Sequence, residues 1–146
     1  MVQKDPFNNV LITQLTDPAA GTATITSSSV DLQGAHGVYI SVSFGESGDT
    51  LSTTRRYNCK LQDSPDDSVW TDVAAGFVIG AATNAFGNVN GAADDDAVYS
   101  LGYSGTERYL RALATLTGTN GNGTPIGIYA ITWPRRQATV SNVVTP

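Results

Sequence analysis

Turn-forming residues interrupt this sequence roughly every 8–15 residues, and most runs between them alternate apolar and polar side chains. The clearest run is VYISVSF at 38–44, in which every second side chain is large and apolar. RRYNCKLQDS at 55–64 and IGIYAITWP at 126–134 alternate in the same way. Short alternating segments with regular turns are typical of an antiparallel β-sandwich or barrel. We therefore predict an all-β fold with little helix.

One stretch, YSGTERYLRALATL at 103–116, fits both a helical and a strand pattern. Its Leu, Ala, Arg and Glu residues favour helix, but only by a few tenths of a kcal/mol per residue. The Gly-rich segment at 117–127 holds two Asn-Gly pairs and separates this stretch from the alternating run that follows. Two runs flanking an Asn-Gly turn are typical of a β-hairpin. We predict that residues 107–116 form a strand paired with 126–133.

The chain has 146 residues, 40% of them hydrophobic, which suits a single domain with one core. We expect extended segments at both ends, about 1–9 and about 135–146. Residues 74–96 are rich in Gly, Ala and Asn and are predicted to form one long loop. Trp70 begins a Trp-x-x-Val unit whose apolar residues need a core, so we predict that its side chain is mostly buried.

Composition excludes several classes of function. The net charge is −5 with only eight Lys and Arg residues, which argues against a nucleic-acid partner. No apolar run approaches the roughly 20 residues that a membrane-spanning helix needs. The first residues, MVQKDPFNNV, lack the apolar core of a secretory signal. The single cysteine, Cys59, rules out an internal disulfide, so we expect a protein made in a reducing cytoplasm.

The residues that could carry chemistry do not form a recognisable site. One histidine, His36, and one cysteine, Cys59, cannot assemble a catalytic triad or a zinc site. The acidic clusters at 63–67 and 94–96 could offer oxygen ligands to calcium, but they lack the spacing of an EF-hand loop. Aspartate is also common in turns for conformational reasons. We therefore predict no catalytic residue, no cofactor and no required metal.

Three segments resemble a known group of proteins. They are VDLQGAHGVYISVSFG (30–45), KLQDSPDDSVWTDV (60–73) and SLGYSGTERYLRALATLTGTNGNGTPIGIYAITWPRRQ (100–137). Their order and motifs are similar to those of small structural proteins encoded in the head gene clusters of tailed bacteriophages, prophages and gene transfer agents. The resemblance covers nearly the whole chain from residue 30 onward.

The resemblance implies a jelly-roll-like β-sandwich and a virion protein attached to the outside of a phage capsid. Such a protein is a decoration (cement) protein or the base of a head spike or fibre, and it has no catalytic role. Its expected partners are the major capsid protein or other virion proteins, and it would be made in the cytoplasm of the bacterial host. Two alternatives stay open: a structural protein of the tail or head–tail junction, and a carbohydrate- or receptor-binding β-sandwich module.

We also expect a homo-oligomer, a trimer or a pentamer, because oligomers engage a symmetric lattice with multiplied avidity. The candidate interfaces are the two ends of the chain, MVQKDPFNNV and the segment after Pro134. In the C-terminal segment the valines have no local apolar partners, and the arginines suit carboxylates on a partner. A solvated pair of terminal charges is the alternative explanation for the arginines. The candidate interface residues are Arg135, Arg136, Val140, Val143 and Val144.

Overall fold

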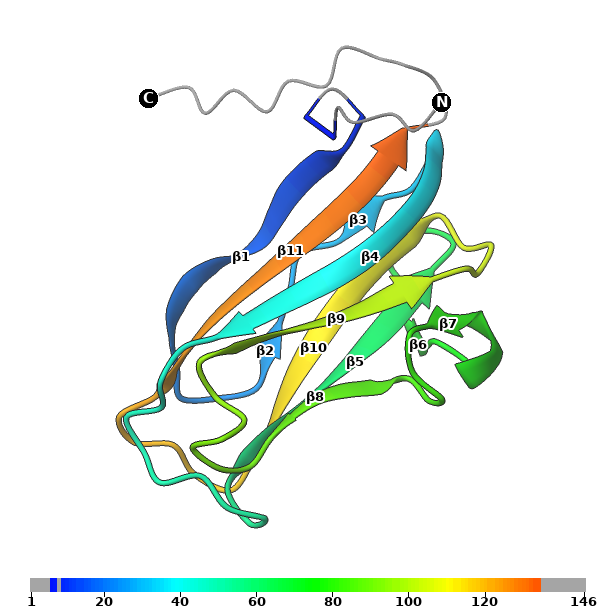
Figure 1. The fold of residues 1–146 in the computed structure, drawn as a ribbon. Coiled ribbons are helices and arrows are strands. Elements are labelled where there is room, and N and C mark those ends of the chain that lie inside the picture. The colour runs from blue at the N-terminus through cyan, green and yellow to red at the C-terminus, as the bar shows by residue number, and fades with distance from the viewer. Residues whose placement is uncertain (1–5, 8, 135–146) are drawn as a thin grey trace.

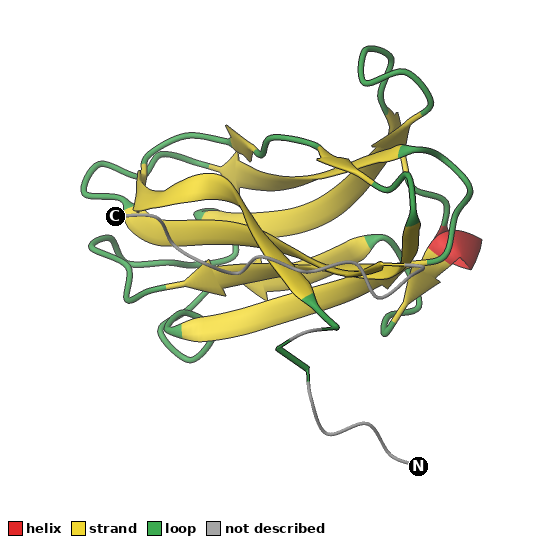
Figure 2. Cartoon of the chain, turned by 90° about the horizontal axis from the view of Figure 1, so that it is seen from above, coloured by secondary structure: helices red, strands yellow, loops and turns green. Residues whose placement is uncertain are grey.

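Two antiparallel β-sheets pack face to face in the computed structural model, which describes residues 6–7 and 9–134 (Figures 1 and 2). The first sheet has the strand order β1 (Leu11–Gly21), β11 (Thr124–Pro134), β4 (Ala35–Phe44), β9 (Ala97–Tyr103) and β7 (Val78–Ile79). The second has the order β2 (Ile25–Thr26), β10 (Tyr109–Thr117), β5 (Arg56–Ser64) and β6 (Thr71–Asp72), with β3 (Val30–Asp31) beside β10 and β8 (Ala85–Val89) beside β5. The predicted all-β sandwich is confirmed.

The order of the main strands is that of a jelly roll. We count β2 and β3 as one interrupted strand and leave out β6 and β7, which have two residues each. The eight main strands, numbered one to eight along the chain, are then β1, β2/β3, β4, β5, β8, β9, β10 and β11. The first sheet then holds strands one, eight, three and six, and the second holds two, seven, four and five. The chain changes sheet at every connection except the one between β5 and β8. This arrangement is the pair of interleaved Greek keys that defines a jelly roll.

Alternation along the strands explains the core between the sheets. In β4 the side chains of Val38, Ile40, Val42 and Phe44 are all buried, as the sequence pattern predicts. In the second sheet the corresponding inward residues of β5 are Tyr57, Cys59 and Leu61, and those of β10 are Leu110, Ala112 and Ala114. Burying each large aliphatic side chain stabilises the fold by roughly 1.5–3 kcal/mol.

The ambiguous stretch forms a strand, β10, but the predicted hairpin with β11 is wrong. Strand β10 pairs with β5 along its whole length, whereas β11 pairs with β4 and β1 in the other sheet. Residues 118–123 therefore cross between the sheets instead of forming a tight turn. The carboxylate of Asp49 holds this loop, because it accepts hydrogen bonds from the N–H groups of Asn122 (2.8 Å) and Gly123 (2.9 Å). The two strands face each other across the core.

The predicted long loop at 74–96 is also wrong in part. This region contains a 3₁₀ turn, η1 (Ala75–Phe77), and the strands β7 and β8. Val89 of β8 is fully buried. The side-chain amide of Asn84 accepts a hydrogen bond from the N–H of Leu61 and donates one to its carbonyl, both at 2.8 Å, and so mimics a strand partner for β5. The rest of the region connects these elements.

Candidate interaction surface

The outer face of the first sheet, turned away from the core, carries a row of apolar side chains that crosses all five strands. In antiparallel strands, directly opposed residues point to the same side of the sheet. The register places Ile12 of β1 opposite Ile131 of β11, and Ile131 opposite Tyr39 of β4. Tyr39 lies opposite Gly102 of β9, which in turn lies opposite Ile79 of β7. The row is thus continuous from one edge of the sheet to the other.

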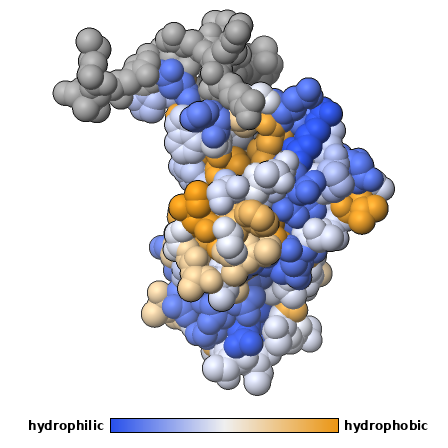
Figure 3. Space-filling model, turned by 90° about the vertical axis from the view of Figure 1, so that its right-hand side faces the viewer, coloured by the Kyte–Doolittle hydropathy of each residue, from blue (hydrophilic) through white to orange (hydrophobic). Residues whose placement is uncertain are grey.

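This outer face is uncharged over its central strands, where apolar and aromatic side chains lie beside the hydroxyls of Ser41, Ser43 and Ser100. Strands β4, β9 and β11 contain no Asp, Glu, Lys or Arg. Several of the outward side chains are strongly exposed, among them Val98 (67%), Ile12 (60%), Ile79 (59%) and Trp133 (38%). Figure 3, which faces the side of the molecule where β7 lies, shows apolar surface gathered between hydrophilic regions. Contiguous exposed apolar surface of this kind marks an interaction site more often than scattered single residues do.

Two glycines let large side chains lie flat on this face. Trp133 lies across its cross-strand partner Gly37, where a Cβ would be 3.6 Å from the indole. Ile79 approaches Gly102 so closely that a Cβ there would lie 3.0 Å from the Cβ of Ile79. Aromatic and aliphatic cover of a strand glycine is a recurrent way of stabilising a sheet. Here it also determines the shape of the groove beside these residues.

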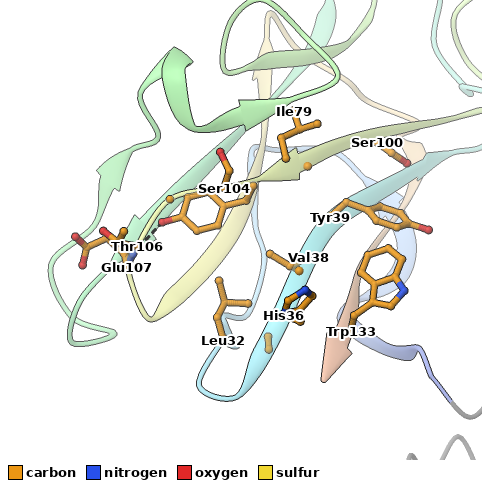
Figure 4. Close-up of a pocket in the computed structure, with 15 residues that line it drawn as sticks. Leu32, His36, Val38, Tyr39, Ile79, Ser100, Ser104, Thr106, Glu107 and Trp133 are labelled. Carbon is orange, nitrogen blue, oxygen red and sulfur yellow. Dashed lines mark hydrogen bonds between the residues drawn. The ribbon is translucent and has the colours of Figure 1, made fainter. Parts of the chain in front are cut away.

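A groove of about 1150 Å³ begins at this face and runs around the end of β9 (Figure 4). Tyr39 and Trp133 form one wall, with their ring centroids 5.6 Å apart and their planes tilted by 45°. Thr106 and Glu107, from the loop between β9 and β10, lie on the other side. The groove therefore joins an aromatic wall to a polar rim, the mixture found in binding sites that orient a ligand through a few polar groups.

Hydrogen bonds anchor the loop that forms the polar rim. The hydroxyl of the buried Tyr103 donates to the carboxylate of Asp63 at 2.8 Å and accepts from the N–H of Glu107 at 3.1 Å. Thr71 donates a second hydrogen bond to Asp63 at 3.1 Å. Burial, together with the hydrogen bond to Asp63, raises the pKa of Tyr103 well above its ordinary value. The phenol therefore stays protonated and links the two sheets at this end of the sandwich.

The outer face of the second sheet has different chemistry. Lys60 forms an ion pair with Asp72 at 2.7 Å, and the Lys60 hydrogen bond lowers the pKa of that carboxyl, with help from Gln62. Arg111 donates two hydrogen bonds to the side-chain oxygen of Gln62, at 3.0 and 2.7 Å. Its guanidinium lies 4.2 Å from the ring centroid of Trp70. On this face Lys60 thus has a charged partner, and Arg111 has polar and aromatic partners.

Trp70 is only partly exposed, which agrees with the prediction that its side chain is mostly buried, but its ring is not part of the core. The side chain lies on the outer face, where Arg111 covers it. The apolar residue of the Trp-x-x-Val unit that enters the core is Val73, which is 3% exposed.

The five interface residues named from the sequence lie outside the described residues, as do residues 135–146 as a whole: Arg135, Arg136, Val140, Val143 and Val144. Of the predicted N-terminal segment at 1–9, the structure describes only residues 6, 7 and 9.

The residues considered for chemistry are distributed through the fold. Cys59 is buried in the core, and burial raises the pKa of its thiol to about 12. His36 is exposed on β4 and lines the groove. Asp66 accepts hydrogen bonds from the N–H groups of Ser68 and Val69, at 3.0 and 2.9 Å, and so stabilises the turn after β5. In the described part of the chain, no cluster of three or more His, Cys, Asp or Glu side chains is arranged to hold a metal ion.

Comparison with known proteins adds no relative. No protein-family model matches the chain, and no curated protein matches it significantly. Within residues 6–7 and 9–134, no helix is long and apolar enough to cross a membrane.

Sequence reasoning missed the groove and its aromatic wall, although a signal was present. Tyr39 and Trp133 occupy the alternate positions of their strands, opposite the core-facing residues, where a solvated sheet would carry polar side chains. Aromatic residues on the outer face of uncharged strands are the pattern that could have located this surface.

Proposed function

We propose that this chain is a structural protein attached to the outside of a phage capsid, and that it binds other virion proteins, chiefly the major capsid protein, through the outer face of the first sheet. One observation carries the proposal: the central strands of this sheet have no charged residue, and exposed apolar side chains lie on the outer face of the sheet, Val98 and Trp133 on central strands and Ile12 and Ile79 on edge strands. Protein interfaces are depleted of charge at their centre and enriched in aromatic residues.

The fold and the chain ends support this role. Jelly rolls are common in viral capsid domains, although a fold alone does not establish a function. Leu11, near the start of β1, lies opposite Thr132, near the end of β11, so the described chain starts and finishes at the same end of the sandwich. We include in the proposal that the protein acts as a homo-oligomer, a trimer or a pentamer.

Binding to particles tests the capsid role. Particles of the parent phage assembled without this protein are incubated with the wild-type chain, with Val98→Glu, or with Thr115→Glu as a matched control on the outer face of the second sheet. Val98 is exposed, so a charge there leaves the fold intact but must be desolvated in the interface. We expect Val98→Glu to weaken binding by about tenfold or more, which corresponds to roughly 1.4 kcal/mol, and Thr115→Glu to weaken it less than about twofold.

Bound protein per particle is measured by sedimentation followed by gel densitometry, and folding of each variant by circular dichroism. Equal losses for the two variants would show that the first sheet has no special part in binding. Absence of binding by the wild-type chain would refute attachment to the capsid.

A further inference from the structure

The groove includes an open strand edge. Pairing between β4 and β9 ends at Val38 and Tyr103, whereas β4 continues to Ala35 with β11 as its partner on the other side. Within the described residues, Ala35 and Gly37 therefore have a paired strand on one side only, and His36 between them lies at an irregularity in the pairing with β11; all three line the groove. Exposed strand edges of this kind accept extended segments, with the backbone supplying affinity and the neighbouring pockets supplying specificity.

The walls of the groove suit a segment with both aliphatic and cationic side chains. Tyr39, Ile79 and Trp133 offer apolar contact, and the last two are substantially exposed. Glu107 lies on the opposite rim, with its carboxylate turned away from the aromatic wall (Figure 4). A suitable occupant would bury aliphatic groups against the aromatic wall and would bring positive charge to the rim that carries Glu107.

The C-terminal segment, RRQATVSNVVTP at 135–146, has this composition. Of the eight Lys and Arg residues in the chain, Arg135 and Arg136 lie here, and none of the thirteen Asp and Glu residues does. Its Thr and Val residues are β-branched and favour an extended backbone. Pro134, from which the segment continues, lies opposite the groove residue Ala35. Fully extended, the segment spans up to about 40 Å, enough to reach a neighbouring molecule.

We infer that this groove binds the C-terminal segment of a second copy of the chain. To enter the groove of its own subunit, the segment would have to reverse direction directly after Pro134, which would bring Arg135 and Arg136, instead of the valines, to the aromatic wall. Insertion into a neighbour needs no such reversal. When each copy inserts its segment into the next, the contacts are heterologous, and they give the proposed trimer or pentamer when the rotation between copies closes a ring. The inference rests on the homo-oligomeric part of the proposed function.

Disulfide trapping in the full-length protein tests this inference. Ser100→Cys places a thiol at the groove, Val140→Cys places one in the segment, and Thr53→Cys is a control at the opposite end of the sandwich. The native Cys59 is buried and stays unreactive because burial suppresses its thiolate. In one mixture Ser100→Cys chains are combined with Val140→Cys chains, and in the control mixture Thr53→Cys chains take the place of Ser100→Cys chains. We expect the first mixture to form a disulfide-linked heterodimer about tenfold faster than the control mixture, because docking raises the effective concentration of the thiols.

The double variant Ser100→Cys/Val140→Cys separates the two possible grooves. Linked multimers are expected as its main product, and a predominantly intrachain disulfide would place the segment in its own groove and overturn the inference. Equal heterodimer rates for the groove and control positions would also overturn it. These rates are measured without particles. A negative result in the trapping experiment therefore tests the groove inference alone, whereas the Val98→Glu experiment tests capsid binding.

Trp133 provides a second measurement. In a Trp70→Phe chain, Trp133 is the remaining tryptophan, and its emission is expected to shift to the red on dilution as the segments leave the grooves. Val140→Asp should give the red-shifted emission at every concentration. An emission independent of both dilution and Val140→Asp would contradict the inference. A saccharide that changes Trp133 emission would also contradict the inference if disulfide trapping is no faster at the groove position than at the control position. The ligand of the groove would then be a sugar.

Discussion

On the outer face of the second sheet, Lys60 pairs with Asp72 and Arg111 lies over Trp70, whereas the central strands of the first sheet carry no charged residue. Both sheets contribute buried side chains to the same core. The two sheets therefore differ in what their outer faces contact, not in how they fold. A face that carries charged and polar side chains is suited to water, while an uncharged face with exposed aliphatic and aromatic groups is suited to a protein partner.

The largest effect on stability should come from the tryptophan of the second sheet. Trp70→Ala removes the contact with Arg111 and a half-buried ring, so we expect the free energy of unfolding to fall by about 1–2 kcal/mol. Trp133→Ala, the matched change on the first sheet, should cost less than about 1 kcal/mol but should impair association. Urea unfolding followed by circular dichroism measures both. A larger stability loss for Trp133→Ala would reverse the comparison.

Acid should act through the second sheet and the ion pairs near it. Hydrogen bonds from Lys60 and Arg108 lower the pKa values of Asp72 and Asp31, respectively, in the folded state. These pairs therefore stabilise the fold above the unfolded pKa of about 3.9, and their contribution is lost as the pH falls through the lowered values. Both members of the Lys60–Asp72 pair are well exposed, so Asp72→Asn should change stability at pH 7 by less than about 0.5 kcal/mol.

The measurement is the unfolding free energy of wild type and Asp72→Asn between pH 3 and pH 7. The difference between the two proteins should shrink toward the acid end of this range. A difference that grows as the pH falls would contradict the assigned direction.

Salt should have little effect on binding through the first sheet. Because its central strands are uncharged, raising the salt concentration screens little that contributes to the interface. Particle binding of the wild-type chain should change less than about threefold between 0.05 and 0.5 M NaCl. A steep loss of binding with salt would instead assign the contact to charged surfaces.

The smallest expected effect is that of chelation, which should be none. In the acidic cluster at 63–67, the carboxylate of Asp63 accepts hydrogen bonds from Tyr103 and Thr71, and that of Asp66 accepts hydrogen bonds from its own turn. We interpret the cluster at 94–96 as turn residues. EDTA should leave the melting temperature unchanged in a thermal scan. A drop of several degrees that calcium restores would show that one of these clusters binds metal.

Alternation made the inner faces predictable from the sequence, but strand partners were not. Along most of β4 and β10 every second residue is buried as expected. This follows because a strand with the core on one side and solvent or a partner on the other alternates inward-facing and outward-facing side chains. Periodicity shows which side chains face inward and does not show which strand lies alongside. That is why the Asn-Gly segment suggested a hairpin, although β10 and β11 belong to opposite sheets.

The candidate surface was harder to predict because it depends on register and on strand ends. Tyr39, Ile131 and Gly102 form one row only because three strands are aligned in a particular register. The groove exists because β9 stops at Tyr103 while β4 extends beyond it. Neither the alignment nor the difference in length can be derived from the local pattern of a single strand.

A cryo-EM map of the parent particle at side-chain resolution tests the central claim most directly. The account predicts jelly-roll density on the outside of the capsid, with Val98, Tyr39 and the rest of the outer face of the first sheet in contact with other virion proteins. Lys60 and Arg111 on the second sheet should face solvent. A particle in which the second sheet makes the contact and the first faces solvent, or which lacks this protein on its capsid, would contradict the account.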